Sequence, residues 1–325
     1  MRILATGSSG FIGTSFCEMY HGSRRYDIIG VDRRPARERF TGIEYVTADL
    51  TNREKVAEVV HTFEPDLVVH LAAQARVEPS YTDPIETYRA NVLATIHLLE
   101  ATRALGSKFD RFIYASSETV YGPASVYPTP EDASPNPQSA YAASKVASET
   151  IVRHAHGMRH VILRSAMGYG PRSNPKEQVV AKFLDKALRD EPLLFPTGLG
   201  PDQHPTRDVN YVDNYSHGVG QVIDSGVEGV YNIGSGEETS ILDLAQRVVD
   251  LVGSGSIRFD PRFAYRPGET GLRTWLDISR ARADFGYRPR LSLDEGLRET
   301  RAWLQKNKDY WQTPPLAAAE EAPHV

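Results

Sequence analysis

Cysteine is almost absent from this sequence. The 325 residues contain one cysteine, Cys17, so a disulfide framework within the chain is excluded, and the chain fits a reducing compartment. Cys17 lies in a segment with a helical pattern, where a free cysteine behaves as a small apolar residue. We therefore expect Cys17 to pack in the core and to take no part in chemistry.

Long apolar runs are also absent. No stretch is apolar over the roughly 20 residues that a membrane-spanning helix needs. The chain starts with MRILATGSSG, which leads directly into a strand and a glycine turn and has none of the features of a signal peptide. We therefore expect a cytoplasmic protein with no membrane partner.

Neither sign of charge dominates the sequence. The 37 lysines and arginines are mixed with 42 aspartates and glutamates, which gives a formal net charge of −5. This mixture indicates no basic face for nucleic acid. The ten histidines show no spacing with cysteine or carboxylates that is typical of metal ligands. The sequence thus predicts no nucleic-acid partner and no metal site.

Short apolar runs alternate with helical patterns through the first half of the chain. Strands are predicted at 2–5, 27–31, 66–70, 109–116 and 160–164, and helices at 11–21, 52–63, 84–105 and 140–154. This alternation is typical of an α/β fold with a doubly wound parallel sheet that is covered by helices on both faces. The apolar strands fit burial on both sides.

A glycine-rich turn follows the first predicted strand. In 6-TGSSGFIGT-14 the glycines are Gly7, Gly10 and Gly13, which allow a tight turn, close approach of a pyrophosphate and close packing of helix on sheet. The N-terminal N–H groups of the following helix can face the phosphates. A glycine pattern alone is weak evidence. Its place between a strand and a helix at the start of a βαβ unit predicts a Rossmann-type dinucleotide site.

An acidic residue ends the second predicted strand. Asp32 stands where a carboxylate can bind the ribose hydroxyls of adenosine, although a plain turn residue at a strand end is the alternative. A carboxylate there favours NAD over NADP, because a 2′-phosphate would meet a negative charge. The arginines that follow, Arg33 and Arg34, weaken this preference.

The second half of the chain has a different composition. Residues 171–205 are rich in proline and glycine with one predicted helix at 179–188, and short mixed elements follow to about residue 303. We expect residues 1–170 to form the NAD-binding domain, with some later segments returning to it. Residues 171–305 would form a smaller α/β substrate-binding region, and residues 306–325 a disordered tail.

A tyrosine and a lysine stand four residues apart in 141-YAASK-145. Residues i and i+4 lie on one face of a helix, so Tyr141 and Lys145 are predicted neighbours. Most such pairs are solvated surface residues, and the spacing alone does not distinguish a catalytic pair from a surface pair. The other motifs of the chain have to decide.

Several further motifs accompany the glycine turn and the YAASK segment. They are HLAA at 70–73, SSETVYG at 116–122, LRSAMGYGP at 163–171, RDVNYVDN at 207–214 and RPGE at 266–269. With these motifs the chain resembles the extended short-chain dehydrogenase/reductase family, and specifically its nucleotide-sugar epimerase/dehydratase branch, from residue 1 to about residue 305. The combination is more specific for the family than for the reaction.

The resemblance implies a set of site residues. Tyr141 would be the acid/base at a sugar carbon, Lys145 would bind the nicotinamide ribose, and Ser117 would hydrogen-bond the same sugar oxygen. A cation beside a tyrosine lowers the phenol pKa from its usual value of about 10. Contacts to NAD are implied for Gly7, Gly10, Phe11, Ile12, Gly13, Asp32, Arg33, Asp49, Leu50, Leu71, Ala72, Ala73, Asn91, Ser116, Tyr141 and Lys145. Contacts to a nucleotide-diphosphate sugar are implied for Ser117, Glu118, Tyr141, Met167, Arg207 and Arg266.

Residues 117–119 discriminate between reactions. By resemblance, dehydratases carry Thr, an acidic or small residue and then a Glu that is the base at C5, whereas 4-epimerases carry Ser, a small residue and commonly Thr or Ser. Ser117 and Thr119 follow the epimerases, and Glu118 departs from them. Glu118 can hydrogen-bond a hydroxyl near C6, protonate a leaving group there, or be a structural carboxylate. Our hypothesis is that Glu118 faces the substrate and belongs to the catalytic set.

Two other features bear on specificity. Met167 stands where the family usually has an asparagine that touches the sugar nucleotide; a methionine fills an apolar gap but makes no such hydrogen bond. We expect a reshaped pocket near the nicotinamide. Arg207 and Arg266 match positions that hold the diphosphate, which suits a guanidinium fork, with ordinary surface arginines as the alternative.

The sequence thus predicts an NAD-dependent nucleotide-sugar epimerase that acts at C4 through a transient 4-keto intermediate. The alternatives are a 4,6-dehydratase or uronic acid decarboxylase that uses Glu118, and an NAD-binding protein without turnover. The resemblance also implies a homodimer, in which the helices at 84–105 and 140–154 of two subunits form a helix bundle. Alternatively, the apolar stripes of these helices are buried within one subunit.

Overall fold

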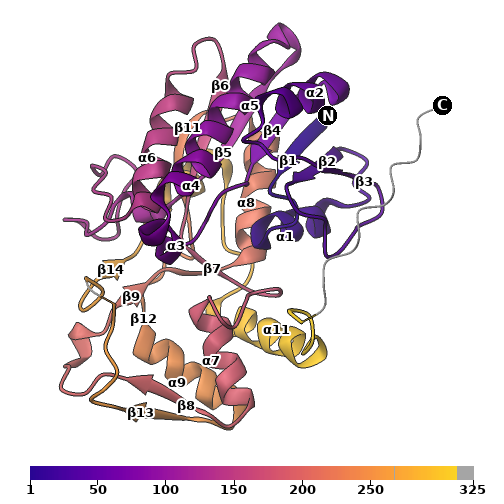
Figure 1. The fold of residues 1–325 in the computed structure, drawn as a ribbon. Helices are drawn as coiled ribbons and strands as arrows, with labels where there is room; N and C mark the ends of the chain where they lie inside the picture. Colours follow the sequence, from indigo (N-terminus) through magenta and orange to yellow (C-terminus); the bar gives the residue numbers. More distant parts are fainter. Residues whose placement is uncertain (267, 313–325) are drawn as a thin grey trace.

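A seven-stranded parallel sheet organises the computed structural model, which describes residues 1–266 and 268–312 (Figure 1). The strand order is β11-β6-β5-β4-β1-β2-β3, and every neighbouring pair is parallel. The strands are β1 (Arg2–Thr6), β2 (Asp27–Asp32), β3 (Ile43–Thr47), β4 (Leu67–His70), β5 (Arg111–Ser117), β6 (Arg159–Ser165) and β11 (Gly229–Ile233). This architecture confirms the predicted Rossmann-type α/β fold.

Helices cover both faces of this sheet because its strands are apolar on both sides. On one face Ile3 packs with Phe16 of α1 (Phe11–Tyr20) and Val219 of α8 (Val212–Ser225). On the other face Leu4 packs with helices that connect the central strands. These are α2 (Arg53–Phe63), α5 (Ala94–Arg103) and α6 (Ala140–Arg153). Adjacent residues Ile3 and Leu4 thus serve opposite cores, as the alternation of side chains along a strand requires.

The helix expected at 84–105 is not one regular α-helix. It follows the short α3 (Val77–Thr82) and consists of α4 (Pro84–Tyr88), the π-helical η1 (Arg89–Leu93) and α5. Asp83 caps α4 by accepting a hydrogen bond from the Glu86 amide. Single π turns inside helices are frequent at functional sites, and this one carries Asn91.

A second, smaller lobe lies below the sheet in Figure 1, and along the chain it begins at β7 (Met167–Tyr169). Its strand pairs are β7 with β10 (Val209–Tyr211), and β8 (Pro192–Phe195) with β13 (Ser256–Phe259); β12 (Thr239–Ser240), β9 (Thr206–Arg207) and β14 (Arg273–Thr274) form a third small sheet. The helices α7 (Val179–Leu188), α9 (Ile241–Val252) and α11 (Leu293–Lys306) enclose its own apolar core.

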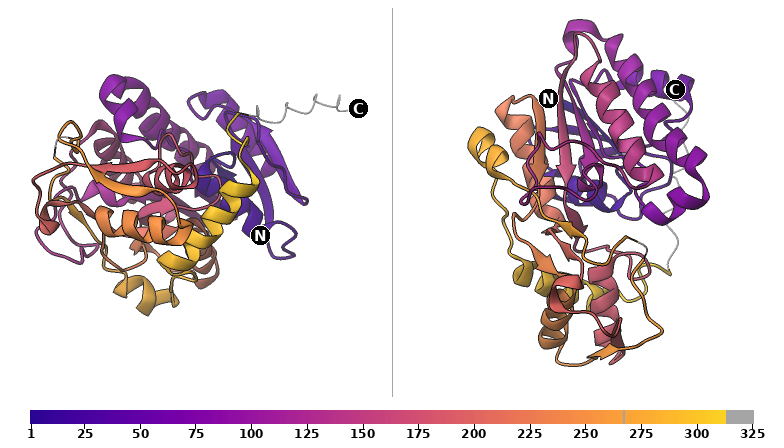
Figure 2. Two further views of the ribbon diagram at one scale, coloured as in Figure 1. Left: turned by 90° about the horizontal axis from the view of Figure 1, so that it is seen from below. Right: turned by 90° about the vertical axis from the view of Figure 1, so that its left-hand side faces the viewer.

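The second half therefore holds longer helices than the short mixed elements expected from its sequence. Besides α9 and α11, α8 runs from Val212 to Ser225, and α10 (Ser279–Phe285) follows later; α8 and β11 return to the large sheet. The right-hand view of Figure 2 shows the two lobes one above the other. The remaining short helices are η2 (Gly106–Lys108), η3 (Glu118–Val120) and η4 (Pro201–Gln203).

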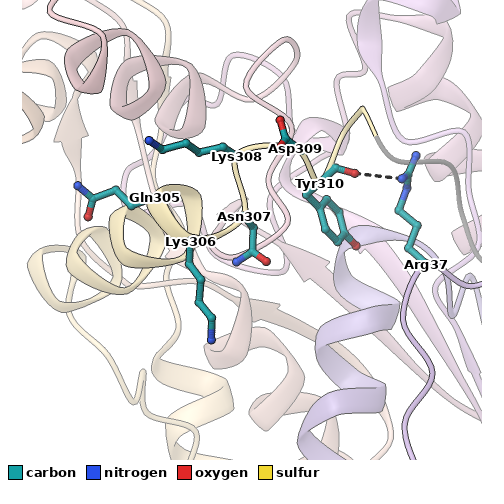
Figure 3. A pocket seen from close by; sticks show the side chains of 7 residues that line it. All are labelled: Arg37, Gln305, Lys306, Asn307, Lys308, Asp309 and Tyr310. Atoms are coloured by element: carbon teal, nitrogen blue, oxygen red, sulfur yellow. Dashed lines mark hydrogen bonds between the residues drawn. The ribbon is translucent and has the colours of Figure 1, made fainter.

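The expected disordered tail begins too early at residue 306. Lys306 is the last residue of α11, and the turn that follows packs onto the loop after β2. The Arg37 guanidinium donates to the Tyr310 carbonyl at 3.1 Å and lies over the Tyr310 and Trp311 rings. This corner borders a cavity of about 580 Å³, shown in Figure 3. The rest of the predicted tail, 313–325, lies outside the described residues.

Candidate active site

The glycine turn joins β1 to α1 at the carboxyl edge of the sheet. Gly7 has φ +73°, and a Cβ there would lie 2.6 Å from the Ala72 amide nitrogen. A Cβ on Gly13 would lie 2.0 Å from the Gly7 carbonyl oxygen. Both positions therefore require glycine. The consequence is that the backbones of the turn and of residues 71–73 approach each other closely, as a groove for a dinucleotide needs.

The acid at the end of β2 is oriented by backbone amides. The Asp32 carboxylate accepts hydrogen bonds from the Ser9 and Arg34 amides at 3.1 and 3.0 Å. The Ala48 amide donates to the Asp32 carbonyl at 2.9 Å, which places Asp49 and Leu50 at the same sheet edge. Arg33 points away from Asp32 to an ion pair with Glu86 at 3.3 Å.

These residues fit a bound NAD. Besides the glycine cradle and the fixed Asp32 carboxylate, the hydroxyl of Ser8 is buried and has no hydrogen-bond partner among the described residues. An orphaned hydroxyl inside a glycine turn suits a phosphate oxygen as partner. The start of α1, which includes Phe11 and Ile12, directs free amides to the same place.

Asn91 fastens the loop that follows β4. Its Oδ1 accepts from the Gln74 amide at 2.7 Å, and its Nδ2 donates to the Gln74 carbonyl at 3.1 Å and to Ser144 Oγ at 2.8 Å. Both donors of the amide are thus used within the protein. This geometry favours a positioning role for Asn91, which holds Leu71, Ala72 and Ala73 against the glycine turn, over direct contact with the cofactor.

Ser117, Tyr141 and Lys145 come together between β5 and α6, and all three are buried. The Ser117 side chain lies close enough to the Tyr141 phenol to lower its pKa. Lys145 Nζ donates to the Ala115 carbonyl at 2.7 Å and lies 6.0 Å from the centre of the Tyr141 ring. The ammonium keeps two further N–H groups. The YAASK pair is therefore an interior pair and not a solvated surface pair.

Burial has the largest effect on the pKa values of Tyr141 and Lys145. Burial raises the pKa of Tyr141 to about 12, against a lowering by the Ser117 hydrogen bond and with a further rise from Glu118. Burial lowers the pKa of Lys145 to about 8, opposed by the charge of Glu149. The expected lowering of the phenol pKa is thus not a property of these side chains alone. With these side chains alone, the Tyr141 phenol is protonated at neutral pH, and a further positive charge is needed to favour the phenolate.

Ser116 faces a different partner from Ser117, because successive residues of a strand point to opposite sides. Its hydroxyl donates to Glu149 at 2.6 Å, and Glu149 forms a buried bidentate ion pair with Arg164 at 2.9 and 2.7 Å. The Ser116 hydroxyl is therefore part of a structural network. Its predicted role towards the cofactor rests on the backbone alone.

Glu118 is a buried acid immediately after Ser117. Its Oε2 has no hydrogen-bond partner among the described residues. Burial and the charge of Asp208 raise the pKa of Glu118 to about 8, and Arg207 opposes this rise. Thr119 lies beside the Ser117 side chain, with its hydroxyl 3.0 Å from Ser117 Oγ.

The two predicted diphosphate-binding arginines share one carboxylate. Glu269 Oε1 lies 2.8 Å from Arg266 and 3.5 Å from Arg207. Arg266 also reaches Glu78 of α3, across from its own lobe, at 3.2 Å. Met167 lies next to this group in β7, where its amide donates to the Asp208 carbonyl at 3.1 Å.

Two residues of this site were not assigned from the sequence. Glu269 stands in the RPGE motif, three residues after Arg266, and that spacing is its only signal. Asp208 stands beside Arg207, but its proximity to Glu118 joins segments 90 residues apart and leaves no sequence pattern. Among the described residues no group of three or more histidine, cysteine or acidic side chains could hold a metal ion. No helix in the described ranges is both long and apolar enough to cross a membrane.

The fold and the site together define an extended short-chain dehydrogenase/reductase with NAD as its cofactor. The chain belongs to the NAD dependent epimerase/dehydratase family, whose model matches residues 3–234. A putative UDP-glucose 4-epimerase of Methanocaldococcus jannaschii is 31% identical over 94% of this chain and 99% of its own length. A dTDP-glucose 4,6-dehydratase of Streptomyces antibioticus is 32% identical over 96% of this chain and 95% of its own length.

Solved structures give the same result. The UDP-glucuronic acid 4-epimerase of Bacillus cereus, in complex with UDP-glucuronic acid and NAD, is 30% identical with a TM-score of 0.82, and the match covers 94% of this chain and 99% of that one. Relatives with different reactions thus share this fold at similar identity. The reaction therefore has to be argued from the site itself.

Proposed function

We propose that this protein is a nucleotide-sugar epimerase that inverts C4 through a transient 4-keto intermediate. The observation that carries the proposal is the geometry at 117–119. A 4,6-dehydratase needs a base at C5, and the position that would supply it holds Thr119, whose hydroxyl is fixed beside Ser117. Ser117 and Tyr141 remain as a complete pair for removing and returning a proton.

In this reaction Tyr141, Ser117 and Lys145 have separate roles. Tyr141 acts as the phenolate, which a nearby positive charge has to favour over the phenol. In that form it accepts the proton of the C4 hydroxyl and returns it at the end, with Ser117 hydrogen-bonded to the same oxygen. NAD, when bound, would take a hydride from C4 and return it to the opposite face of the sugar. Lys145 binds the nicotinamide ribose with its two remaining N–H groups, and its charge favours the phenolate that forms. Because sugar oxidation and reduction balance, no external reductant is consumed.

We further propose that residues 1–170 bind NAD and that residues 171–305 bind the nucleotide sugar. Arg207 and Arg266, which both pair with Glu269, would hold the diphosphate. Arg207 is nearly buried and Arg266 is exposed. The inner arginine would therefore contribute more to affinity than the outer one, since its charge is less screened by water.

Proton NMR with a panel of nucleotide sugars in deuterated buffer tests the reaction. An epimerase that acts at C4 interconverts two sugars with no solvent deuterium at C5. A 4-keto-6-deoxy product with deuterium at C5 would instead show a dehydratase that uses Glu118, the second candidate. Tyr141→Phe is expected to reduce turnover by at least about a hundredfold, the usual contribution of a positioned acid/base, while NAD binding persists.

A homodimer is also proposed, in a cytoplasmic setting that the single cysteine favours. Large apolar side chains are exposed along α4 and α5: Ile85 is 73% exposed, Tyr88 40% and Ile96 39%. Leu98 and Val152 are buried within the subunit, so only part of the predicted stripes is free for a partner. Sedimentation of the protein and of Ile85→Glu tests this, with loss of the dimer expected for the variant.

A further inference from the structure

Glu118 is a buried acid with an unpartnered carboxyl oxygen. The side chain is only 8% exposed, and its Oε2 has no hydrogen-bond partner among the described residues. A buried polar atom without a partner costs free energy, so its retention calls for an explanation. A structural carboxylate at a helix start would be bonded to backbone amides, but the η3 amide of Thr119 is bound by Ser117 instead.

The position of Glu118 identifies what could be its partner. Glu118 lies close enough to Tyr141 to raise the pKa of that phenol, and close enough to Arg207 for the guanidinium to stabilise the Glu118 carboxylate. It is therefore near both the proposed acid/base and a proposed diphosphate ligand. The sugar of a nucleotide-diphosphate sugar has to reach from one to the other, because one end is held at the diphosphate and C4 reacts at the other.

We propose that Glu118 is a specificity-determining residue, whose buried carboxyl group forms a hydrogen bond with an oxygen carried next to C4 on the sugar. This inference rests on the proposed function. Ser117 would bind the C4 oxygen, and the Cα atoms of consecutive residues are about 3.8 Å apart. Glu118 begins η3 directly after the strand and lies near both Tyr141 and Arg207. Its side chain would therefore face the substituent of a neighbouring carbon, which is a hydroxymethyl group in a hexose and a carboxylate in a uronic acid.

The charged groups around Glu118 keep it in the donor form. Asp208, on the turn between β9 and β10, raises its pKa; Arg207 of β9 lowers it; and Tyr141 of α6 is neutral at this pH. Burial outweighs Arg207, so the pKa of Glu118 stands at about 8. Below that pH the acid donates to a sugar carboxylate. Above it, two carboxylates meet in a buried site and repel each other.

The kinetic test compares substrates across pH. For wild type, the ratio of kcat/KM for a UDP-uronic acid to kcat/KM for the matching UDP-hexose should fall above about pH 8, by roughly tenfold per pH unit. Glu118→Gln keeps a donor of the same shape but cannot ionise, so its ratio should be flat. Glu131→Gln, at a half-buried acid that accepts from the Asn232 amide at 2.9 Å, is the matched control and should keep the wild-type profile.

A binding measurement keeps the test independent of turnover. Calorimetry at pH 8 in buffers of different ionisation heat should show proton uptake when UDP-glucuronic acid binds to wild type, and none for Glu118→Gln. Equal uptake in both proteins, or an unchanged substrate ratio in Glu118→Ala, would overturn the inference alone. Wild type that takes up the proton but epimerises no sugar would instead refute the proposed function and leave the role of Glu118 in recognition standing.

Discussion

At the scale of single residues, His70 shows how the sheet edge is held rigid. The ring is buried, with Nδ1 2.7 Å from Thr6 Oγ1 and Nε2 3.1 Å from Thr95 Oγ1. Thr6 also accepts from the Ala72 amide at 3.3 Å. His70 therefore links β1, β4 and α5 directly beneath the glycine turn.

Acid should destabilise the protein through this histidine. Burial, with the charge of Lys145, lowers the pKa of His70 to about 3, whereas the unfolded residue titrates near 6.5. Between these values the unfolded chain binds more protons, so stability falls as pH falls from about 6.5 to 3, by at most about 5 kcal/mol. Urea unfolding of wild type and His70→Gln over this range checks this. The variant should be weaker at pH 7 but show a shallower acid loss; parallel curves would contradict the assignment.

At the scale of elements, the π turn of η1 determines where the Asn91 side chain points. An extra residue in the helix directs this side chain at Gln74 and Ser144, which lie on the β4 loop and on α6. Asn91→Ala should cost about 2 kcal/mol, because the Gln74 amide and carbonyl lose their partner, and should speed amide exchange at Gln74. Asn307→Ala, which loses one bond to the Trp303 carbonyl, is the control and should cost less than about 1 kcal/mol. Equal losses would show that the Asn91 network is not special.

Sequence periodicity located most elements of the large sheet, but it did not reveal the π turn. The contacts of Asn91 with Gln74 and Ser144 are tertiary, so the apolar spacing within 84–105 alone did not indicate the extra residue. In the smaller lobe the sequence does contain helix-capping residues, but its many prolines and glycines led to the prediction of short mixed elements. Ser240 and Gly253 cap α9, and Ser292 with Glu295 forms a capping box at α11. The shared carboxylate of Glu269 is a tertiary contact and has no local signature.

At the scale of the whole molecule, Arg172 ties the two lobes together. It follows β7, is buried, and pairs with Glu38 at 2.6 Å and with Glu18 of α1 at 2.7 Å. Tyr310, in the segment after α11, lies close enough to Glu38 to lower the pKa of that carboxyl. One guanidinium therefore joins the loop after β2 and α1, close to the segment after α11.

Two substitutions at Arg172 distinguish the stabilising effect of its charge from the cost of its backbone conformation. Its φ of +68° lies in the left-handed region, which costs a residue other than glycine roughly 1 kcal/mol. Arg172→Ala should lose about 3 kcal/mol, because it leaves Glu38 partly buried without its cation. Arg172→Gly should lose about 1 kcal/mol less, since glycine accepts this φ freely. Guanidinium unfolding measures both; a glycine variant no more stable than the alanine variant would exclude strain at this position.

The buried cysteine has a practical consequence. Cys17 is fully enclosed in α1, and burial raises the pKa of its thiol to about 12, so a thiol-specific dye has neither access nor a thiolate to attack. Since no second cysteine exists in the chain, the dye reacts only with molecules in which Cys17 has become exposed by unfolding. The enzyme thus carries a built-in unfolding reporter, and any cysteine introduced on its surface becomes a unique attachment point.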